Sequence, residues 1–106
     1  MAFRVEISDL ALTDAEEYVS FIRDVNREPE ASEKWFRGLT VAIYSLAKMP
    51  YRCTVIPESA SFSVELRQLV YISHRIIFQL DPAGNVVKVL RIYPGAKRRL
   101  GPADLT

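Results

Sequence analysis

Several residue types that commonly support chemistry are scarce in this sequence. The 106 residues include one cysteine, Cys53, and one histidine, His74. A lone cysteine cannot form an internal disulfide, which fits a reducing compartment, and these two side chains are too few for an ordinary protein metal site. Used as a nucleophile and its base, Cys53 and His74 would need a third, orienting residue, and the sequence suggests none. We therefore expect no metal and no cofactor.

Long apolar runs, glycine-rich loops and a strong net charge are also missing. Charged residues interrupt the longest apolar stretches, so no segment is expected to span a membrane. The N-terminus lacks the apolar core of a signal peptide, and the four glycines form no phosphate-binding loop. A net charge of +1 argues against coating nucleic acid by bulk electrostatics. These absences predict a cytoplasmic protein.

What is present has ordinary globular composition. With 49% hydrophobic and 25% charged residues, a chain of 106 residues is long enough for one domain and too short for two, so residues 1–106 are expected to form a single domain. The charge is uneven: acidic residues concentrate in the first third, whereas Lys97, Arg98 and Arg99 make a basic C-terminal tail, residues 95–106.

The N-terminal half predicts a strand and two helices. Residues 3–7 alternate apolar and charged side chains, as a half-buried strand does. The first helix could begin at Asp9, capped by Ser8, or at Asp14, because Thr13 and Glu16 form a capping box. Its apolar stripe would consist of Ala11, Ala15, Tyr18, Val19, Ile22 and Val25.

A break at residues 26–28 separates this helix from the next. Pro29 suits the first turn of a helix, and Pro50 ends the run. The second apolar stripe would consist of Ala31, Trp35, Leu39, Ala42, Ile43 and Leu46. Two amphipathic helices joined by a short break predict an antiparallel hairpin.

The C-terminal half changes to strand periodicity. A loop at 51–64, with a short strand near 54–56, precedes three β-rich runs, at 65–72, 75–80 and 86–93. Ser73-His74 links the first two runs, and residues 81–85 form a turn between the second and third. The chain is therefore predicted to have an α+β fold: an N-terminal strand, a two-helix hairpin and a three-stranded antiparallel meander, with the helices on one face of the sheet.

This order, together with three local sequences, resembles the RelE/ParE superfamily of bacterial type II toxins, which includes plasmid stabilisation proteins. The segment 65–78 looks like the family's central hairpin, 89–98 like its last strand and basic segment, and 46–50 like the end of its helical half. The resemblance covers roughly residues 3–100 and is closer to the ParE branch. It implies a growth-inhibiting toxin that a cognate antitoxin neutralises.

An antitoxin partner implies a binding surface. An apolar groove beside the helical hairpin would receive the antitoxin's C-terminal segment. Trp35, Phe36 and Tyr44 are candidates to line it, although aromatic residues at helical spacing more often face a core.

The RNase branch of the superfamily, which cleaves mRNA on the ribosome, implies catalytic residues. Arg75 matches an arginine used on phosphate there, and Arg98, or its neighbour Lys97, falls near a C-terminal catalytic arginine. Arginine suits phosphate because its planar fork binds two oxygens. An alternative for Arg75 is a structural ion pair with Glu65 or Asp81.

A general base is harder to find. Where the RNase branch carries lysines, this chain has Leu66, Gln68 and Val70, and its C-terminal tyrosine is absent. Tyr93 and His74 are the remaining candidates, although each is more often structural. His74, placed in a hairpin link, is expected to be exposed with a pKa near 6.5.

Three functions remain open. A ParE-like toxin would bind and inhibit DNA gyrase and needs no catalytic base, so the missing lysines favour it. A RelE-like toxin would cleave mRNA on the ribosome, with Arg75, Arg98 and Tyr93 as catalytic residues. A non-toxic member would bind only its antitoxin. In the first two cases, the expected target-binding residues are Arg67, Arg75, Arg91, Lys97, Arg98 and Arg99.

Overall fold

Two helices and a five-stranded sheet make up the computed structural model, which describes residues 2–95 and 99–105. Lys97 and Arg98 therefore lie outside the described residues. In chain order the elements are β1 (Arg4–Ile7), α1 (Asp9–Ser20), α2 (Pro29–Ser45), β2 (Thr54–Val55), β3 (Leu66–Tyr71), β4 (His74–Asp81) and β5 (Val86–Pro94). The predicted α+β fold with its meander is confirmed.

The first helix begins at the earlier of its two possible starts. Ser8 has extended backbone angles, and its Oγ accepts a hydrogen bond of 3.1 Å from the Ala11 amide, which caps α1 at Asp9. After Ser20 the chain continues in a wider π-helical turn, Phe21–Val25. This turn changes the side-chain register. Val25 is consequently exposed, and the expectation that it extends the apolar stripe was wrong.

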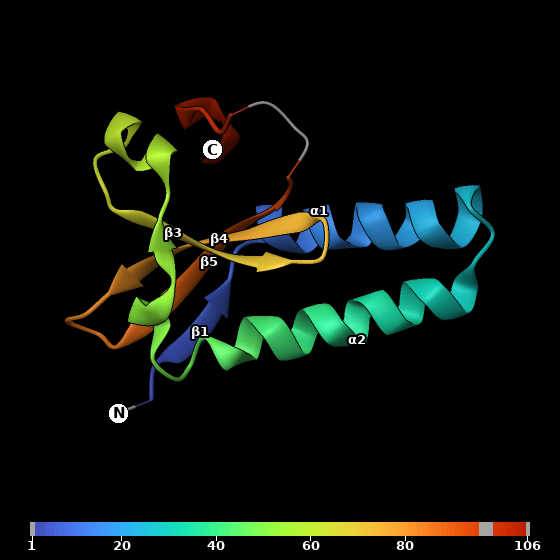
Figure 1. Ribbon diagram of the computed structural model, residues 1–106, viewed down its shortest axis with the longest axis horizontal. Coiled ribbons are helices and arrows are strands. Elements are labelled where there is room, and N and C mark those ends of the chain that lie inside the picture. The colour runs from blue at the N-terminus through green and yellow to red at the C-terminus, as the bar shows by residue number, and fades with distance from the viewer. Residues whose placement is uncertain (1, 96–98, 106) are drawn as a thin grey trace.

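The second helix begins at Pro29 as predicted, and its apolar stripe buries Trp35, Leu39, Ile43 and Leu46. Figure 1 shows α1 and α2 side by side, joined at the end far from the chain termini. Within residues 2–95 and 99–105, no helix has the length and apolar character needed to cross a membrane.

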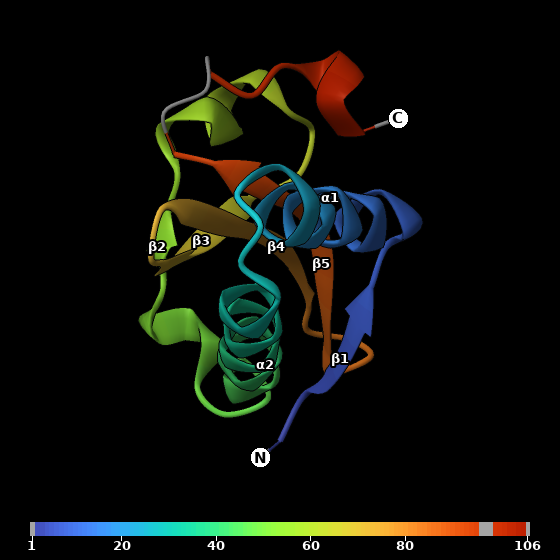
Figure 2. The ribbon, with the colours of Figure 1, turned by 90° about the vertical axis from the view of Figure 1, so that its right-hand side faces the viewer.

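The strands are arranged in the order β1-β5-β4-β3-β2. The meander β3-β4-β5 is antiparallel, and the short β2 pairs with β3. The N-terminal strand β1 runs parallel to β5, so the first strand in the sequence lies beside the last, as Figure 2 shows. The sheet is therefore mixed.

A β-bulge in β5 reverses the alternation of its side chains between the two faces of the sheet. The register between β4 and β5 shifts between Ile77 and Phe78, which pair with Arg91 and Val89. One extra residue reverses which face later side chains point to. Val89 before the bulge and Ile92 after it consequently both face the helices.

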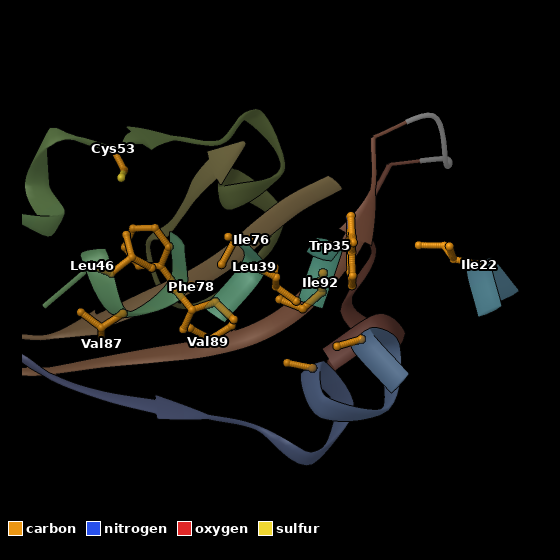
Figure 3. Packing of buried hydrophobic residues seen from close by; sticks show 13 residues of the cluster. Ile22, Trp35, Leu39, Leu46, Cys53, Ile76, Phe78, Val87, Val89 and Ile92 are labelled. Carbon is orange, nitrogen blue, oxygen red and sulfur yellow. The ribbon is translucent and has the colours of Figure 1, made fainter. Parts of the chain in front are cut away.

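Two hydrophobic cores lie on opposite faces of the sheet. The helix-side core, seen in Figure 3, lies between the two helices and the strands. Its buried members are Ala11, Ala15, Ile22, Trp35, Leu39, Ile43, Leu46, Cys53, Ile76, Phe78, Val87, Val89 and Ile92.

The far-side core was not anticipated from the sequence. Its buried members are Ile56, Leu66, Ile77, Tyr93 and Leu100. A 3₁₀ turn at Pro57–Ser61 and the C-terminal segment 99–105 cover it, and these two segments lie side by side in Figures 1 and 2. The helices thus cover one face, as predicted, and irregular segments cover the other.

Candidate functional site

Arg75, at the start of β4, is held in a buried ion pair. Its Nη1 and Nη2 each donate a 2.8 Å hydrogen bond to the carboxylate of Glu58, and its Nε donates a 2.6 Å bond to Gln68 Oε1. The side chains of Arg75 and Glu58 are 16% and 5% exposed. The sequence suggested Glu65 or Asp81 as a structural partner, and Glu58 takes that place instead.

The surroundings of Glu58 favour its charged form. Hydrogen bonds from the Arg75 guanidinium lower the pKa of this carboxyl to about 2, against the opposing effect of burial. A further bond of 3.2 Å comes from the Leu100 amide. The carboxylate therefore joins β4 to the C-terminal segment.

Arg91, on β5, forms a second pair of the same kind. Its Nε and Nη2 donate 2.8 Å hydrogen bonds to the carboxylate of Asp14 on α1, which also accepts a 3.0 Å bond from the Ile92 amide. The remaining guanidinium nitrogen donates to the Asp104 carbonyl. The C-terminal segment is consequently fastened at Leu100 through Arg75–Glu58 and at Asp104 through Arg91–Asp14.

The other predicted target-binding arginines differ in their surroundings. Arg67 donates to the Cys53 carbonyl at 2.6 Å and to Glu65 at 3.0 Å, and its guanidinium lies 5.3 Å from the Tyr51 ring centre. Arg99 is exposed at the start of the C-terminal segment. Thus Arg67, Arg75 and Arg91 all bind groups of the protein itself, and among the described candidates these three arginines have different partners.

Both candidate bases are buried. Tyr93 is 0% exposed in the far-side core, with the Arg91 guanidinium 5.6 Å from its ring centre. His74 is 4% exposed, which contradicts the expectation of an exposed histidine. Burial lowers the pKa of His74, and the nearby charge of Asp14 acts in the opposite direction. Tyr93 is enclosed by the far-side core, whereas His74, although buried, lines a pocket of about 180 Å³ together with Asp14 and Tyr18.

The environment of His74 explains its burial. The tight turn between β3 and β4 is Ile72-Ser73, so His74 is already a strand residue. Its ring lies 4.4 Å from the Tyr18 ring and 5.3 Å from the Trp35 ring, between centres. Its Nδ1 lies 3.1 Å from Ser73 Oγ. His74 is therefore part of an aromatic cluster beneath the helices.

The three candidate antitoxin residues divide between core and surface. Trp35 is buried in the helix-side core, as the structural alternative predicted. Phe36 and Tyr44 are partly exposed on α2 and line a narrow apolar cavity of about 40 Å³ between α1 and α2, together with Leu12 on α1. We call this the interhelix groove.

A larger open hollow was missed at the sequence level. It has a volume of about 640 Å³ and lies where the end of the helical hairpin meets the β3–β4 turn. We call it the helix-tip groove. Its lining includes Ile22, Lys34, Trp35, Arg37, Val41, Tyr71 and Ile72.

Two exposed apolar residues mark the helix-tip groove. Val41 and Ile72 are 72% and 73% exposed. Ile72 also has a φ of 53°, a left-handed conformation that β-branched residues rarely adopt. Strained residues of this kind tend to occur at functional sites, where the surrounding structure holds them. An exposed turn would normally carry a polar residue. At Ile72 the groove therefore has a residue that is both strained in its backbone and apolar at the surface.

The fold and these surfaces define a small α+β protein with two apolar grooves beside its helical hairpin. A model of the family described as "ParE toxin of type II toxin-antitoxin system, parDE" matches residues 5–99. The chain belongs to this family of ParE toxins. No curated protein matches the sequence.

Solved structures show the same fold at low sequence identity. A structure titled "Chromosomal ParDE TA system from P. aeruginosa" aligns with a TM-score of 0.71 at 16% identity, covering 88% of this chain and 96% of that one. An archaeal RelE–RelB complex from Pyrococcus horikoshii OT3 aligns with a TM-score of 0.57 at 18% identity, covering 92% and 100%. The resemblance to the RelE/ParE superfamily, closer to ParE, is confirmed.

Proposed function

We propose that this toxin acts by binding and inhibiting DNA gyrase, and that it has no catalytic step of its own. The observation that carries the proposal is the Arg75–Glu58 pair: the arginine that could stabilise a phosphorane already binds a carboxylate. RNA cleavage needs cations free to stabilise extra negative charge in the transition state. Inhibition by binding needs only a surface. Such an inhibitor would act in the cytoplasm.

The buried candidate bases support the same choice. Taking the 2′-hydroxyl proton requires a group within hydrogen-bonding reach of the substrate. Tyr93 is enclosed by the far-side core, and His74 is 4% exposed between the rings of Tyr18 and Trp35. Arg75 and His74 are adjacent, but successive strand residues point to opposite faces. A substrate that reached Arg75 would therefore not meet His74.

We assign the target contact to the helix-tip groove. Its exposed Val41 and Ile72 supply apolar area, and Lys34, Arg37 and Glu28 place charged groups at the same surface. Apolar anchors surrounded by charged residues are typical of protein interfaces. Arg99 is a separate exposed cation. Arg75 and Arg91 instead position the C-terminal segment, and Arg67 positions the loop before β2.

We further propose that a cognate antitoxin neutralises the toxin by covering the interhelix groove. Phe36 and Tyr44 present aromatic surface beside Leu12, which suits the apolar face of a partner segment. An antitoxin that binds only the folded toxin must raise its melting temperature. An unchanged melting temperature at saturating antitoxin would exclude this partner.

The experiment that tests the proposed activity adds the purified toxin to DNA gyrase and follows both supercoiling and trapped cleaved DNA. Loss of supercoiling is expected with wild type and not with Val41→Asp or Ile72→Asp. Met49→Asp is the matched control, because Met49 is an equally exposed apolar residue beyond the C-terminal end of α2 and does not line the groove.

A parallel assay on translating ribosomes separates the alternative. Cleaved mRNA with unaffected gyrase would refute the proposal and favour the RelE-like activity. No effect in either assay would leave the chain as an antitoxin-binding member without toxicity. In growing bacteria, pulse-labelling should show DNA synthesis failing before protein synthesis.

A further inference from the structure

Three N–H donors converge on one point next to the far-side core. Nη1 and Nη2 of Arg75 lie 2.8 Å from the two oxygens of Glu58, and the Leu100 amide lies 3.2 Å from one of them. A guanidinium edge combined with a backbone amide is an arrangement that proteins use to bind oxyanions. In this chain the oxyanion is a side chain of the protein itself.

The donors are held by contacts that do not involve Glu58. Gln68 Oε1 accepts from Arg75 Nε and so fixes the plane of the guanidinium. The Leu100 side chain is buried in the far-side core, which fixes its amide. Removing the Glu58 side chain would therefore leave the donors close to their present positions.

The turn that carries Glu58 also has its own attachment. Ser59 Oγ accepts a 3.0 Å hydrogen bond from the Leu66 amide at the start of β3, and the Ile56 amide donates to the Leu66 carbonyl. The main chain at Pro57–Ser61 thus remains attached to β3 without the carboxylate. Glu58 can be replaced while the turn around it stays in place.

We propose that Arg75 and the Leu100 amide form an oxyanion site for a phosphate group, and that Glu58 occupies this site from within the chain. Glu58 is a built-in competitor, because a phosphate can bind only in exchange for the carboxylate. A phosphate offers more oxygens and more negative charge than the carboxylate, and the guanidinium of Arg75 can donate hydrogen bonds to either group. The proposal does not depend on gyrase as the target.

The competitor is effective because it is part of the same chain. A tethered group acts at an effective concentration in the millimolar range or above, without the entropic cost of a second molecule. Wild-type protein should therefore show no measurable phosphate binding at this site. Truncating the side chain should uncover it.

The test compares wild type with Glu58→Ala, which empties the site, and with Glu58→Gln, which fills it with a neutral group. Glu65→Ala is the matched control, because it also removes one negative charge that pairs with an arginine, at an exposed position. Inorganic phosphate is titrated at constant ionic strength, with chloride as the reference anion. The readouts are the melting temperature and the NMR shift of the Leu100 amide.

We expect phosphate to raise the melting temperature of Glu58→Ala and to shift the Leu100 amide. Binding to wild type and Glu65→Ala should be undetectable, as an occupied site requires. Glu58→Gln should fall between them, and adding Arg75→Gln to Glu58→Ala should abolish binding. Because a bound ligand stabilises the folded state, the melting readout works even for a destabilised variant.

A second arm uses a short single-stranded RNA in place of inorganic phosphate. Binding of both probes to Glu58→Ala would identify nucleic-acid phosphate as an accessible ligand, whereas binding of phosphate alone would restrict the site to a free anion. If Glu58→Ala responds no more than Glu65→Ala while Leu100 stays buried, the oxyanion site does not exist. Gyrase inhibition enters none of these readouts, so the two proposals fail separately.

Discussion

Replacing Arg75 by alanine should destabilise the fold severely, because it leaves the Glu58 carboxylate buried without its partner. Removing one member of a buried ion pair costs about 3–5 kcal/mol. The pKa of Glu58 leads to a similar figure: a fall from the ordinary 4.5 to about 2, at 1.36 kcal/mol per unit, corresponds to about 3 kcal/mol. The total free energy of unfolding of a domain of this size is only about 5–15 kcal/mol.

The assay is urea unfolding followed by circular dichroism. Arg4→Ala is the matched control, because Arg4 pairs with Glu6 at the surface, where an ion pair contributes about 0–1 kcal/mol. The double variant Arg75→Met with Glu58→Leu should recover much of the loss, since apolar replacements of a buried pair are often neutral. A loss in Arg75→Ala no larger than in Arg4→Ala would refute the reasoning.

The same pair predicts a pH dependence. Because the folded pKa of Glu58 lies below its unfolded value, the stabilisation is complete above pH 4.5 and is lost as the pH falls towards 2. Unfolding curves of wild type should show this loss in acid, and those of Arg75→Ala should lack it. An Arg75→Ala variant with the wild-type acid profile would place the source of the dependence elsewhere.

Three further outcomes are expected from urea unfolding. Gly38→Ala should lower the free energy of unfolding by about 1–3 kcal/mol rather than strengthen α2, because the added Cβ would collide with Tyr71 Oη. Tyr71→Phe should restore part of this loss. A Gly38→Ala variant as stable as wild type would contradict the geometry. Burial lowers the folded pKa of His74, so the free energy of unfolding should hold above pH 6.5 and fall as the pH drops below it. This fall should vanish in His74→Phe. A wild-type profile that is flat from neutral pH to pH 5 would contradict the prediction. Ile72→Asn should gain about 1 kcal/mol by relieving the left-handed backbone, and an unchanged midpoint would show that Ile72 is not strained.

Local patterns were sufficient to predict most of the elements. Apolar spacing identified both helices, Pro29 marked the start of the second, and alternation located the three long strands. These signals are local, because a few neighbouring residues decide periodicity and capping. The parallel pairing of β1 with β5 and the far-side core depend on the whole fold and have no such signal.

The site was harder to predict because its contacts are distant in sequence. Glu58 lies 17 residues before Arg75, and Asp14 lies 77 residues before Arg91. Each arginine was identified as important, but nothing local indicates which of thirteen acidic residues it meets. Arg75 and Arg91, both expected to contact a target, therefore bind carboxylates that are distant in the sequence, whereas Arg67 binds the nearby Glu65.

The error at His74 came from a single residue of register. The sequence suggested Ser73-His74 as the link between strands, whereas the turn is Ile72-Ser73. Because strand side chains alternate between faces, a shift of one residue moves a side chain from solvent to the core. Nothing in the sequence indicated a turn at Ile72, because isoleucine is typical of strands and rarely adopts the left-handed conformation that it has here.

The pairing of β1 with β5 has a consequence for how the protein is made. The strand that leaves the ribosome first has its sheet partner at residues 86–94, so it must wait until nearly all of the described chain has been synthesised. The helical hairpin can form early from local contacts, but its apolar face is not covered until the meander arrives. The sheet of a nascent chain would thus stay incomplete until β5 has been synthesised. An antitoxin already present would meet the finished fold only at the end of that interval.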